Sequence, residues 1–273
     1  MSGQSLPLSG KTALVTGSSR GIGKAIAAEL ARLGSDIVVT ARTVTRRDDL
    51  PGTIQETVRL VEDLGRRSVA IKADLTVDLD IDALADQAIE AFGGIDILVN
   101  NAAAIDEQMF TSFWDTTAES LKHQVQLNLI APWLLIKALA PEMRKRDGGI
   151  IVNITTGDPA AVPINQPGEG NLPGKGATGA AYPASKAALD RMTRDVANEL
   201  KADKIALFAV GPGFTLTENC EQLGPIGGFD TVYAHSMDVP AKAVGYLCSC
   251  PDPMWYTGKV IFAPDFVREH NLL

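Results

Sequence analysis

Tyr182 and Lys186 are the residues of this chain whose types and spacing best suit proton transfer. They stand four positions apart in the run Tyr182-Pro-Ala-Ser-Lys186, so on a helix they share one face. A free phenol, with a pKa of about 10, is a poor acid or base at neutral pH. A fixed ammonium beside it favours the phenolate and lowers that pKa. The pair could therefore exchange a proton with an alcohol or carbonyl oxygen, although such pairs also arise by chance on solvated helices.

A glycine-rich turn far upstream strengthens this interpretation. The run Thr16-Gly-Ser-Ser-Arg-Gly-Ile-Gly23 follows a predicted strand and precedes a predicted helix. A helix N-terminus offers unpaired N–H groups and the positive end of the helix dipole to a pyrophosphate. Glycine allows the sharp turn and the close approach of such a ligand. In this context the turn predicts a dinucleotide site, which glycine spacing alone would not support.

Short apolar segments alternate with longer helical patterns along the chain. Strands are predicted at 13–16, 36–40, 68–73, 95–100, 150–154, 205–210 and 259–262. Helices are predicted near 22–33, 53–64, 81–91, 117–146, 181–200 and 240–249. The strands are almost continuously apolar, which is typical of parallel strands covered on both faces. We expect an α/β fold with one doubly wound parallel sheet of about seven strands, in a single domain spanning residues 1–273.

Two segments interrupt the alternation. Residues 157–181 are rich in Gly, Pro and Ala and separate the fifth predicted strand from Tyr182. A loop this long in a compact domain is either functional or disordered, so it could form a wall of an active site or a surface excursion. Residues 214–240 follow the sixth strand, and we expect a substrate lid with short helical pieces there.

Composition restricts the partners. The 273 residues carry a net charge of −8, which argues against nucleic acid or an anionic membrane as the main partner. The apolar runs are shorter than the roughly 18 to 20 residues of a membrane span, and the first residues lack the features of a signal peptide. We therefore expect a cytoplasmic protein. The three cysteines and three histidines show no metal-ligand spacing, so no metal site is expected.

Further motifs occur in a fixed order along the chain. Asp74-Leu75 follows the third predicted strand, and Asn100-Asn101-Ala102-Ala103 ends the fourth. Asn128 lies on the long predicted helix, and Pro212-Gly213 precedes Thr217. With the glycine turn and the Tyr-Lys pair, the chain resembles the compact, single-domain branch of the short-chain dehydrogenase/reductase family, over nearly its whole length. Ala103 departs from the glycine usual in that family.

The resemblance implies a Rossmann fold and hydride transfer between a nicotinamide and a carbonyl or carbinol carbon. It makes Tyr182 the acid/base, while Lys186 lowers the pKa of the phenol and holds the nicotinamide ribose. Asn128 would keep a water in a proton relay. The usual serine at the end of the fifth strand is a threonine here; we place Thr156 in its role, with Thr155 as the lesser candidate. The implied cofactor-binding residues are Gly17, Ser19, Arg20, Gly21, Ile22, Gly23, Arg42, Asp74, Leu75, Asn101, Ala102, Tyr182, Lys186, Pro212, Gly213 and Thr217.

The end of the second strand bears on the choice between NAD and NADP. An acidic residue at this place accepts hydrogen bonds from the free ribose hydroxyls of NAD. Ala41 stands there, followed by Arg42, and Arg20 lies in the glycine turn. Guanidinium groups suit a 2′-phosphate because their planar fork pairs two oxygens. We expect NADP, with NAD possible, although both arginines could also be merely solvated.

The expected function is therefore that of an NAD(P)-dependent oxidoreductase, NADP-preferring, acting on a small to medium, largely apolar carbonyl compound or alcohol. The alternative is a Rossmann-fold NADP-binding protein with weak or no catalysis, suggested by the threonine substitution and the insertion at 157–181. A sugar-nucleotide epimerase is disfavoured because only about sixty residues follow the sixth strand. Apolar residues on more than one face of the helices at 117–146 and 181–200 predict an apolar surface that needs cover. The resemblance implies a homodimer or homotetramer joined through these helices.

Overall fold

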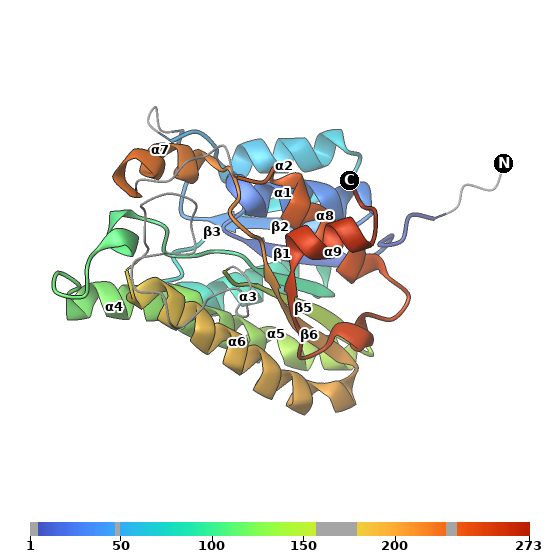
Figure 1. Cartoon of the computed structure of the whole chain (residues 1–273). Helices are drawn as coiled ribbons and strands as arrows, with labels where there is room; N and C mark the ends of the chain where they lie inside the picture. Colours follow the sequence, from blue (N-terminus) through green and yellow to red (C-terminus); the bar gives the residue numbers. More distant parts are fainter. Residues whose placement is uncertain (1–4, 47–49, 157–178, 228–233) are drawn as a thin grey trace.

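A parallel sheet of seven strands forms the centre of the protein, in the order β3-β2-β1-β4-β5-β6-β7 (Figure 1). The computed structural model describes residues 5–46, 50–156, 179–227 and 234–273, with only the backbone at 224–227. Every neighbouring pair of strands is parallel. The strands are β1 (Thr12–Thr16), β2 (Asp36–Ala41), β3 (Ser68–Lys72), β4 (Ile97–Asn100), β5 (Gly149–Ile154), β6 (Ile205–Gly211) and β7 (Val260–Phe262).

Helices cover both faces of this sheet (Figure 1). One face packs against α1 (Gly21–Arg32), α2 (Ile54–Asp63), α8 (Asp238–Ser249) and α9 (Ala263–Glu269). The other face packs against α3 (Asp78–Phe92), α5 (Ala131–Lys145) and α6 (Ala181–Leu200). This two-sided cover explains why the strands are apolar at nearly every position.

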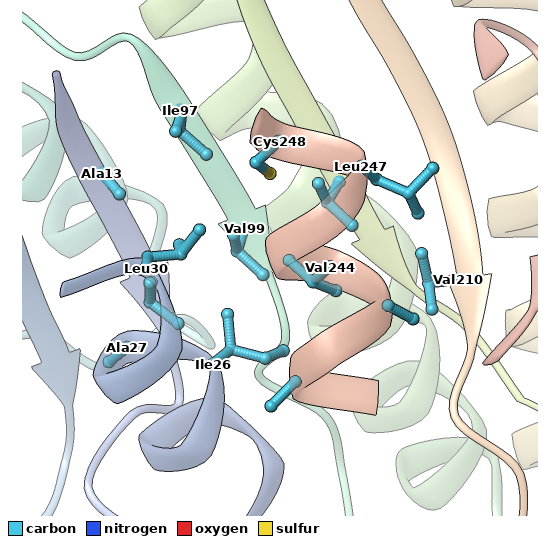
Figure 2. Packing of buried hydrophobic residues seen from close by; sticks show 14 of the residues in the cluster. Ala13, Ile26, Ala27, Leu30, Ile97, Val99, Val210, Val244, Leu247 and Cys248 are labelled. Carbon is cyan, nitrogen blue, oxygen red and sulfur yellow. The ribbon is translucent and has the colours of Figure 1, made fainter. Parts of the chain in front are cut away.

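Alternate residues along each strand enter the two halves of the core. On β1, Ala13 and Val15 face α1 and α8, whereas Leu14 faces the opposite layer. Side chains from α1 and α8 meet over the sheet, as Figure 2 shows for Ile26, Leu30, Val244, Leu247 and strand residues including Ile97 and Val99. Complete burial of such aliphatic side chains contributes roughly 1.5–3 kcal/mol each. The carboxyl ends of the strands are thereby held on a rigid scaffold.

The strand order reverses beside β1. From β1 the chain passes outward through β2 to β3, and then crosses back to place β4 on the other side of β1. In open sheets of this kind, ligands bind in the crevice at the carboxyl ends of the strands where the order reverses. Two further helices, α4 (Ala118–Val125) and α7 (Glu218–Gly227), lie towards one end of the molecule, at the left of Figure 1.

The predicted doubly wound sheet of seven strands is confirmed, with strand ends within two residues of their predicted positions. The helix predicted at 117–146 is interrupted, because one π-helical turn, Gln126–Ile130, separates α4 from α5. Such turns occur frequently at functional sites. The helix α9 was not predicted, and most of the 157–181 insertion, residues 157–178, lies outside the described residues. No helix in the described part of the chain is long and apolar enough to cross a membrane.

Candidate active site

A cavity of about 370 Å³ opens at the carboxyl ends of β1, β2, β4, β5 and β6. Its walls come from the glycine turn, from the residues following these strands, and from the start of α6 and of α7. Segments far apart in the sequence therefore meet in one crevice, as the strand order requires. Most of the predicted site residues line this cavity.

Close packing explains why positions 17 and 23 of the turn are glycine. Gly17 has φ +63°, and a Cβ atom on it would lie 2.9 Å from Ala102 Cα. A Cβ atom on Gly23 would lie 2.4 Å from Asn101 Nδ2 and 2.5 Å from Gly17 O. Asn101 Nδ2 also donates hydrogen bonds to Thr16 O (2.8 Å) and Gly17 O (3.2 Å). These contacts lock the end of β4 against the turn, so a larger side chain at either glycine would displace the start of α1.

The first backbone amide of α1 already has an anionic partner. Gly21 N–H donates a 2.9 Å hydrogen bond to Glu218 Oε2, at the start of α7. A carboxylate is stabilised at a helix N-terminus by the unpaired N–H groups and the helix dipole. Glu218 was not predicted, although its position directly after Thr217, in the expected lid, placed it near the site.

Two arginines flank the end of β2. Both Arg20 and Arg42 line the cavity with Ala41. Arg20 Nη2 donates a 2.8 Å hydrogen bond to Gly52 O, in the segment leading to α2, whereas Arg42 is exposed. The described residues thus provide two positive groups and no acidic side chain on β2 at the cavity end where a 2′-phosphate would lie.

Asp74 does not line the cavity. Its Oδ1 accepts hydrogen bonds from Thr76 N (3.0 Å) and Thr76 Oγ1 (2.7 Å). Burial raises the pKa of Asp74, but these hydrogen bonds and the positive charge of Arg42 outweigh burial and leave the pKa below its ordinary value. Its carboxylate is engaged in closing its own turn, while the following residue, Leu75, does reach the cavity wall.

Tyr182 and Lys186 lie on the first turns of α6, buried beneath the cavity. Lys186 Nζ donates a 2.7 Å hydrogen bond to Ile154 O, at the end of β5. Burial lowers the pKa of Lys186 to about 8, and the negative charge of Asp190, one turn later on α6, opposes this effect. Burial raises the pKa of Asp190 in turn, against the positive charges of Lys186 and Arg194.

The pKa of Tyr182 differs from the sequence-based expectation. Burial raises it to about 12, against a hydrogen bond with Thr156 that lowers it. We expected the ammonium of Lys186 to lower this pKa, and the net shift is in the opposite direction. The reason is that the phenol is withdrawn from water, while the ammonium is directed at Ile154 O. Of the two candidate threonines, Thr156 therefore interacts with Tyr182, whereas the buried Oγ1 of Thr155 has no hydrogen-bond partner among the described residues.

Asn128 is fully buried in the π-helical turn and does not line the cavity. Its Nδ2 donates to Ser185 Oγ (2.9 Å) and to Gln124 Oε1 (3.0 Å). Its Oδ1 accepts from Ala104 N (3.2 Å). The side chain is thus fully engaged with neighbours of Tyr182 and of the cavity wall.

Most of the predicted site residues meet in the cavity. Those that line it are Gly17, Ser19, Arg20, Gly21, Ile22, Arg42, Leu75, Asn101, Ala102, Thr156, Tyr182, Lys186, Pro212, Gly213 and Thr217. Gly23, Asp74 and Asn128 do not line the cavity. Gly23 packs against Gly17 and Asn101, Asp74 bonds Thr76 N, and Asn128 bonds Ala104 N.

One end of the cavity is lined by apolar side chains that were not predicted individually. Its side chains include Ile105, Met109, Phe110, Leu127 and Leu223. Their convergence depends on how the segments after β4 and β6 fold over the sheet, and no local pattern in the sequence indicates that arrangement.

The two halves of the cavity suit different ligands. The half between the glycine turn and Arg42 can hold a dinucleotide, because Gly17 and Gly21 line it without a side chain and the turn leads into the start of a helix. The half beyond Tyr182 can hold an apolar molecule. Tyr182 lines the same cavity, where it can exchange a proton with such a molecule.

Comparisons with known proteins agree with this geometry. Residues 11–225 match the family model described as short chain dehydrogenase. The chain is 30% identical over 264 residues to the 7alpha-hydroxysteroid dehydrogenase of Escherichia coli (strain K12), covering 94% of this chain and 93% of that protein. It is 36% identical over 280 residues to the short chain dehydrogenase penD of Penicillium thymicola, covering 96% and 93%.

A solved structure of similar fold also belongs to a hydroxysteroid dehydrogenase. A 7 alpha-hydroxysteroid dehydrogenase complexed with NADH and 7-oxo glycochenodeoxycholic acid has a TM-score of 0.76 and 29% identity, with 94% of each chain covered. The fold is therefore shared with a protein whose structure contains NADH.

Proposed function

Since the chain belongs to the short-chain dehydrogenase family and is a nicotinamide-dependent oxidoreductase, we propose that it interconverts a largely apolar carbonyl compound and its alcohol, with NADP as the preferred cofactor. The single observation that carries the proposal is that the buried Tyr182 lines the same cavity as the glycine turn and a group of apolar side chains. A proton donor in that cavity can serve the oxygen of a substrate bound beside the cofactor.

The chain's own residues would act as follows. The glycine turn and the ammonium of Lys186 would hold the cofactor, which when bound supplies or accepts the hydride. Tyr182 would give a proton to the carbonyl oxygen during reduction and take it back during oxidation. Thr156 would donate a hydrogen bond to the same oxygen. A phenol with a pKa near 12 is neutral at pH 7, which is the form required of a general acid.

Support for NADP comes from charge at the end of β2. Ala41 leaves no carboxylate to repel a 2′-phosphate, and Arg20 and Arg42 both line that end of the cavity. A relative in Arabidopsis thaliana, 33% identical over 222 residues, is named an NADPH-dependent aldehyde reductase-like protein. A solved relative is complexed with NADH, so we infer the cofactor of this chain from its own residues at the end of β2.

Support for an apolar substrate comes from the opposite end of the cavity, where Ile105, Met109, Phe110, Leu127 and Leu223 gather. Relatives named for hydroxysteroids indicate that bulky alicyclic compounds belong among the candidate substrates.

The proposed activity is tested with a panel of aldehydes, alicyclic ketones and steroid alcohols and ketones, each with NADP(H) and NAD(H). Turnover with apolar members supports the proposal, and binding of NADP without turnover of any member would favour the alternative of a non-catalytic binding protein.

The insertion at 157–181 is proposed to border the active site within a single domain spanning residues 1–273, with 214–240 as the substrate lid. Gly179 N–H, at the described end of the insertion, donates a 2.7 Å hydrogen bond to Met109 O, and Met109 lines the cavity. Deletion of residues 163–175 should therefore alter KM for some substrates; identical kinetics with every accepted substrate would remove this role.

We further propose that the protein forms a homodimer or homotetramer and is cytoplasmic. The surface shared by the start of α5 and by α6 has a hollow lined by Ile130, Trp133, Met192 and Val196, and the side chain of Trp133 is 49% exposed. An aromatic residue exposed on an apolar surface suits contact with a second copy.

A further inference from the structure

Gln124 is an amide side chain in an unusual environment. It lies on α4, one helical turn before Asn128, and its exposed fraction is 0%. Glutamine is mostly found at protein surfaces, and a buried polar group needs hydrogen-bond partners to be tolerated. The partners of Gln124 are therefore informative about why an amide stands here.

Gln124 closes a ring of three hydrogen bonds. Ala104 N donates to Asn128 Oδ1 (3.2 Å), Asn128 Nδ2 donates to Gln124 Oε1 (3.0 Å), and Gln124 Nε2 donates to Ala104 O (3.3 Å). Both the N–H and the C=O of Ala104 are thus held by side chains of the α4 region. Only a side chain with an acceptor and a donor can complete this ring, which an aliphatic residue or an ionised carboxylate cannot do.

The ring connects the cavity wall to the catalytic helix. Ala104 follows Ala102 and Ala103, both of which line the cavity. On the other side, the second N–H of Asn128 Nδ2 donates to Ser185 Oγ (2.9 Å), and Ser185 Oγ donates to Tyr182 O (2.7 Å). Each of these hydrogen bonds uses a different N–H or O–H group, so removing one acceptor leaves a buried donor unpaired.

We propose that Gln124 is a positioning residue for proton transfer at Tyr182, acting through Asn128. Its Nε2 anchors the Gln124 side chain on Ala104 O, and its Oε1, held in place in this way, fixes the orientation of the Asn128 amide. Without Gln124, the Asn128 amide loses one of its three partners inside the π-helical turn and is free to reorient. This inference rests on the proposed function, because it assumes that Asn128 supports the reaction.

The test compares Gln124→Met with a matched control, Gln126→Met. Gln126 lies two positions further, is partly exposed, and donates to Asp78 Oδ1 at the surface. We expect Gln124→Met to lower kcat by about 10- to 100-fold, since misplacement by about 1 Å can reduce a rate 100-fold, with KM changed less than about threefold. In the free protein, the Ala104 amide should exchange with deuterium faster. Gln126→Met should match the wild type in both measurements.

A double-mutant comparison isolates the route through Asn128. If Gln124 acts through Asn128, the variant Gln124→Met/Asn128→Ala should be no slower than Asn128→Ala alone. Multiplied losses in the double variant, or a normal kcat in Gln124→Met, would overturn the inference while leaving the role of Asn128 intact. A normal kcat in Asn128→Ala would overturn both that role and the inference. If Gln124→Met does not fold, Gln124→Glu, which keeps the shape and the acceptor, replaces it in every comparison.

Discussion

The amide of Gly21, at the start of α1, donates a 2.9 Å hydrogen bond to the carboxylate of Glu218, which lies 197 positions later along the chain. The contact ties the glycine turn to α7, the helix that borders the cavity beyond β6. A carboxylate occupies a backbone donor at the helix start, where the anionic part of a dinucleotide is expected to bind.

The first prediction follows from this competition. Glu218→Gln should bind NADP more tightly than the wild type, by about fivefold, because a charge at a helix N-terminus is worth about 1 kcal/mol. Calorimetric titration with the oxidised cofactor measures the change. Glu221→Gln is the control, since Glu221 is exposed one turn further along α7 and does not line the cavity. Unchanged or weaker binding by Glu218→Gln would show that its carboxylate does not oppose the cofactor.

Tyr182→Phe tests the acid/base role. The substitution removes the transferable proton and leaves the ring, so turnover should fall by roughly a hundred- to ten-thousand-fold, while the Kd for the cofactor stays within about twofold. Steady-state kinetics and a cofactor titration on the same preparation give both quantities. Near-normal turnover would exclude Tyr182 as the proton donor.

Lys186→Met should inactivate the enzyme and yet stabilise the cofactor-free protein. A pKa lowered from 10.5 to about 8 by burial corresponds to about 3 kcal/mol of destabilisation when Lys186 is charged. The substitution removes this destabilisation, but it also removes the hydrogen bond to Ile154 O, which costs about 1 kcal/mol of stability. The free energy of unfolding at pH 7 should therefore rise by about 2 kcal/mol, as urea denaturation measures it.

The same variant has a defined pH dependence. Below pH 8 the ammonium is present in both the folded and unfolded wild type, so the folded protein bears the full effect of burying a charge. Between pH 8 and 10.5 the folded protein loses this proton while the unfolded chain keeps it. The wild type thus gains stability relative to Lys186→Met as the pH rises through this window. A difference in unfolding free energy that stays constant from pH 7 to 10 would contradict this account.

Replacing Ala41 with Asp and Arg42 with Ser should shift the cofactor preference towards NAD. The new carboxylate would accept hydrogen bonds from ribose hydroxyls and repel a 2′-phosphate, and the positive charge at the end of β2 would be reduced. We expect the ratio of kcat/KM for NADP to that for NAD to fall at least tenfold. A wild-type protein that already prefers NAD would overturn the NADP assignment without affecting the role of Tyr182.

Trp133→Glu should weaken self-association. The exposed indole lies in the hollow shared with Met192 and Val196, and a charge placed there would have to be buried in any symmetric contact. Sedimentation at micromolar concentration should give an oligomeric mass for the wild type and a smaller mass for the variant. A monomeric wild type would exclude the predicted assembly.

The sequence by itself determined the sheet and most of the predicted site residues that meet in the cavity. Strand positions follow from local runs of apolar residues, and the glycine turn and the Tyr182–Lys186 pair are recognised from spacing within one or two helical turns. Parallel strands bring such motifs to one edge of the sheet without further information.

Other features depended on the tertiary structure. The contact of Glu218 with Gly21, the ring around Gln124 and the apolar end of the cavity all join segments that no local pattern relates. The direction of the Tyr182 pKa shift belongs to the same class, because spacing indicated an ammonium nearby but not that the phenol is buried. Local patterns specify what each segment becomes; burial, and therefore the energy of a charge or an unpaired amide, is set only when the segments pack together.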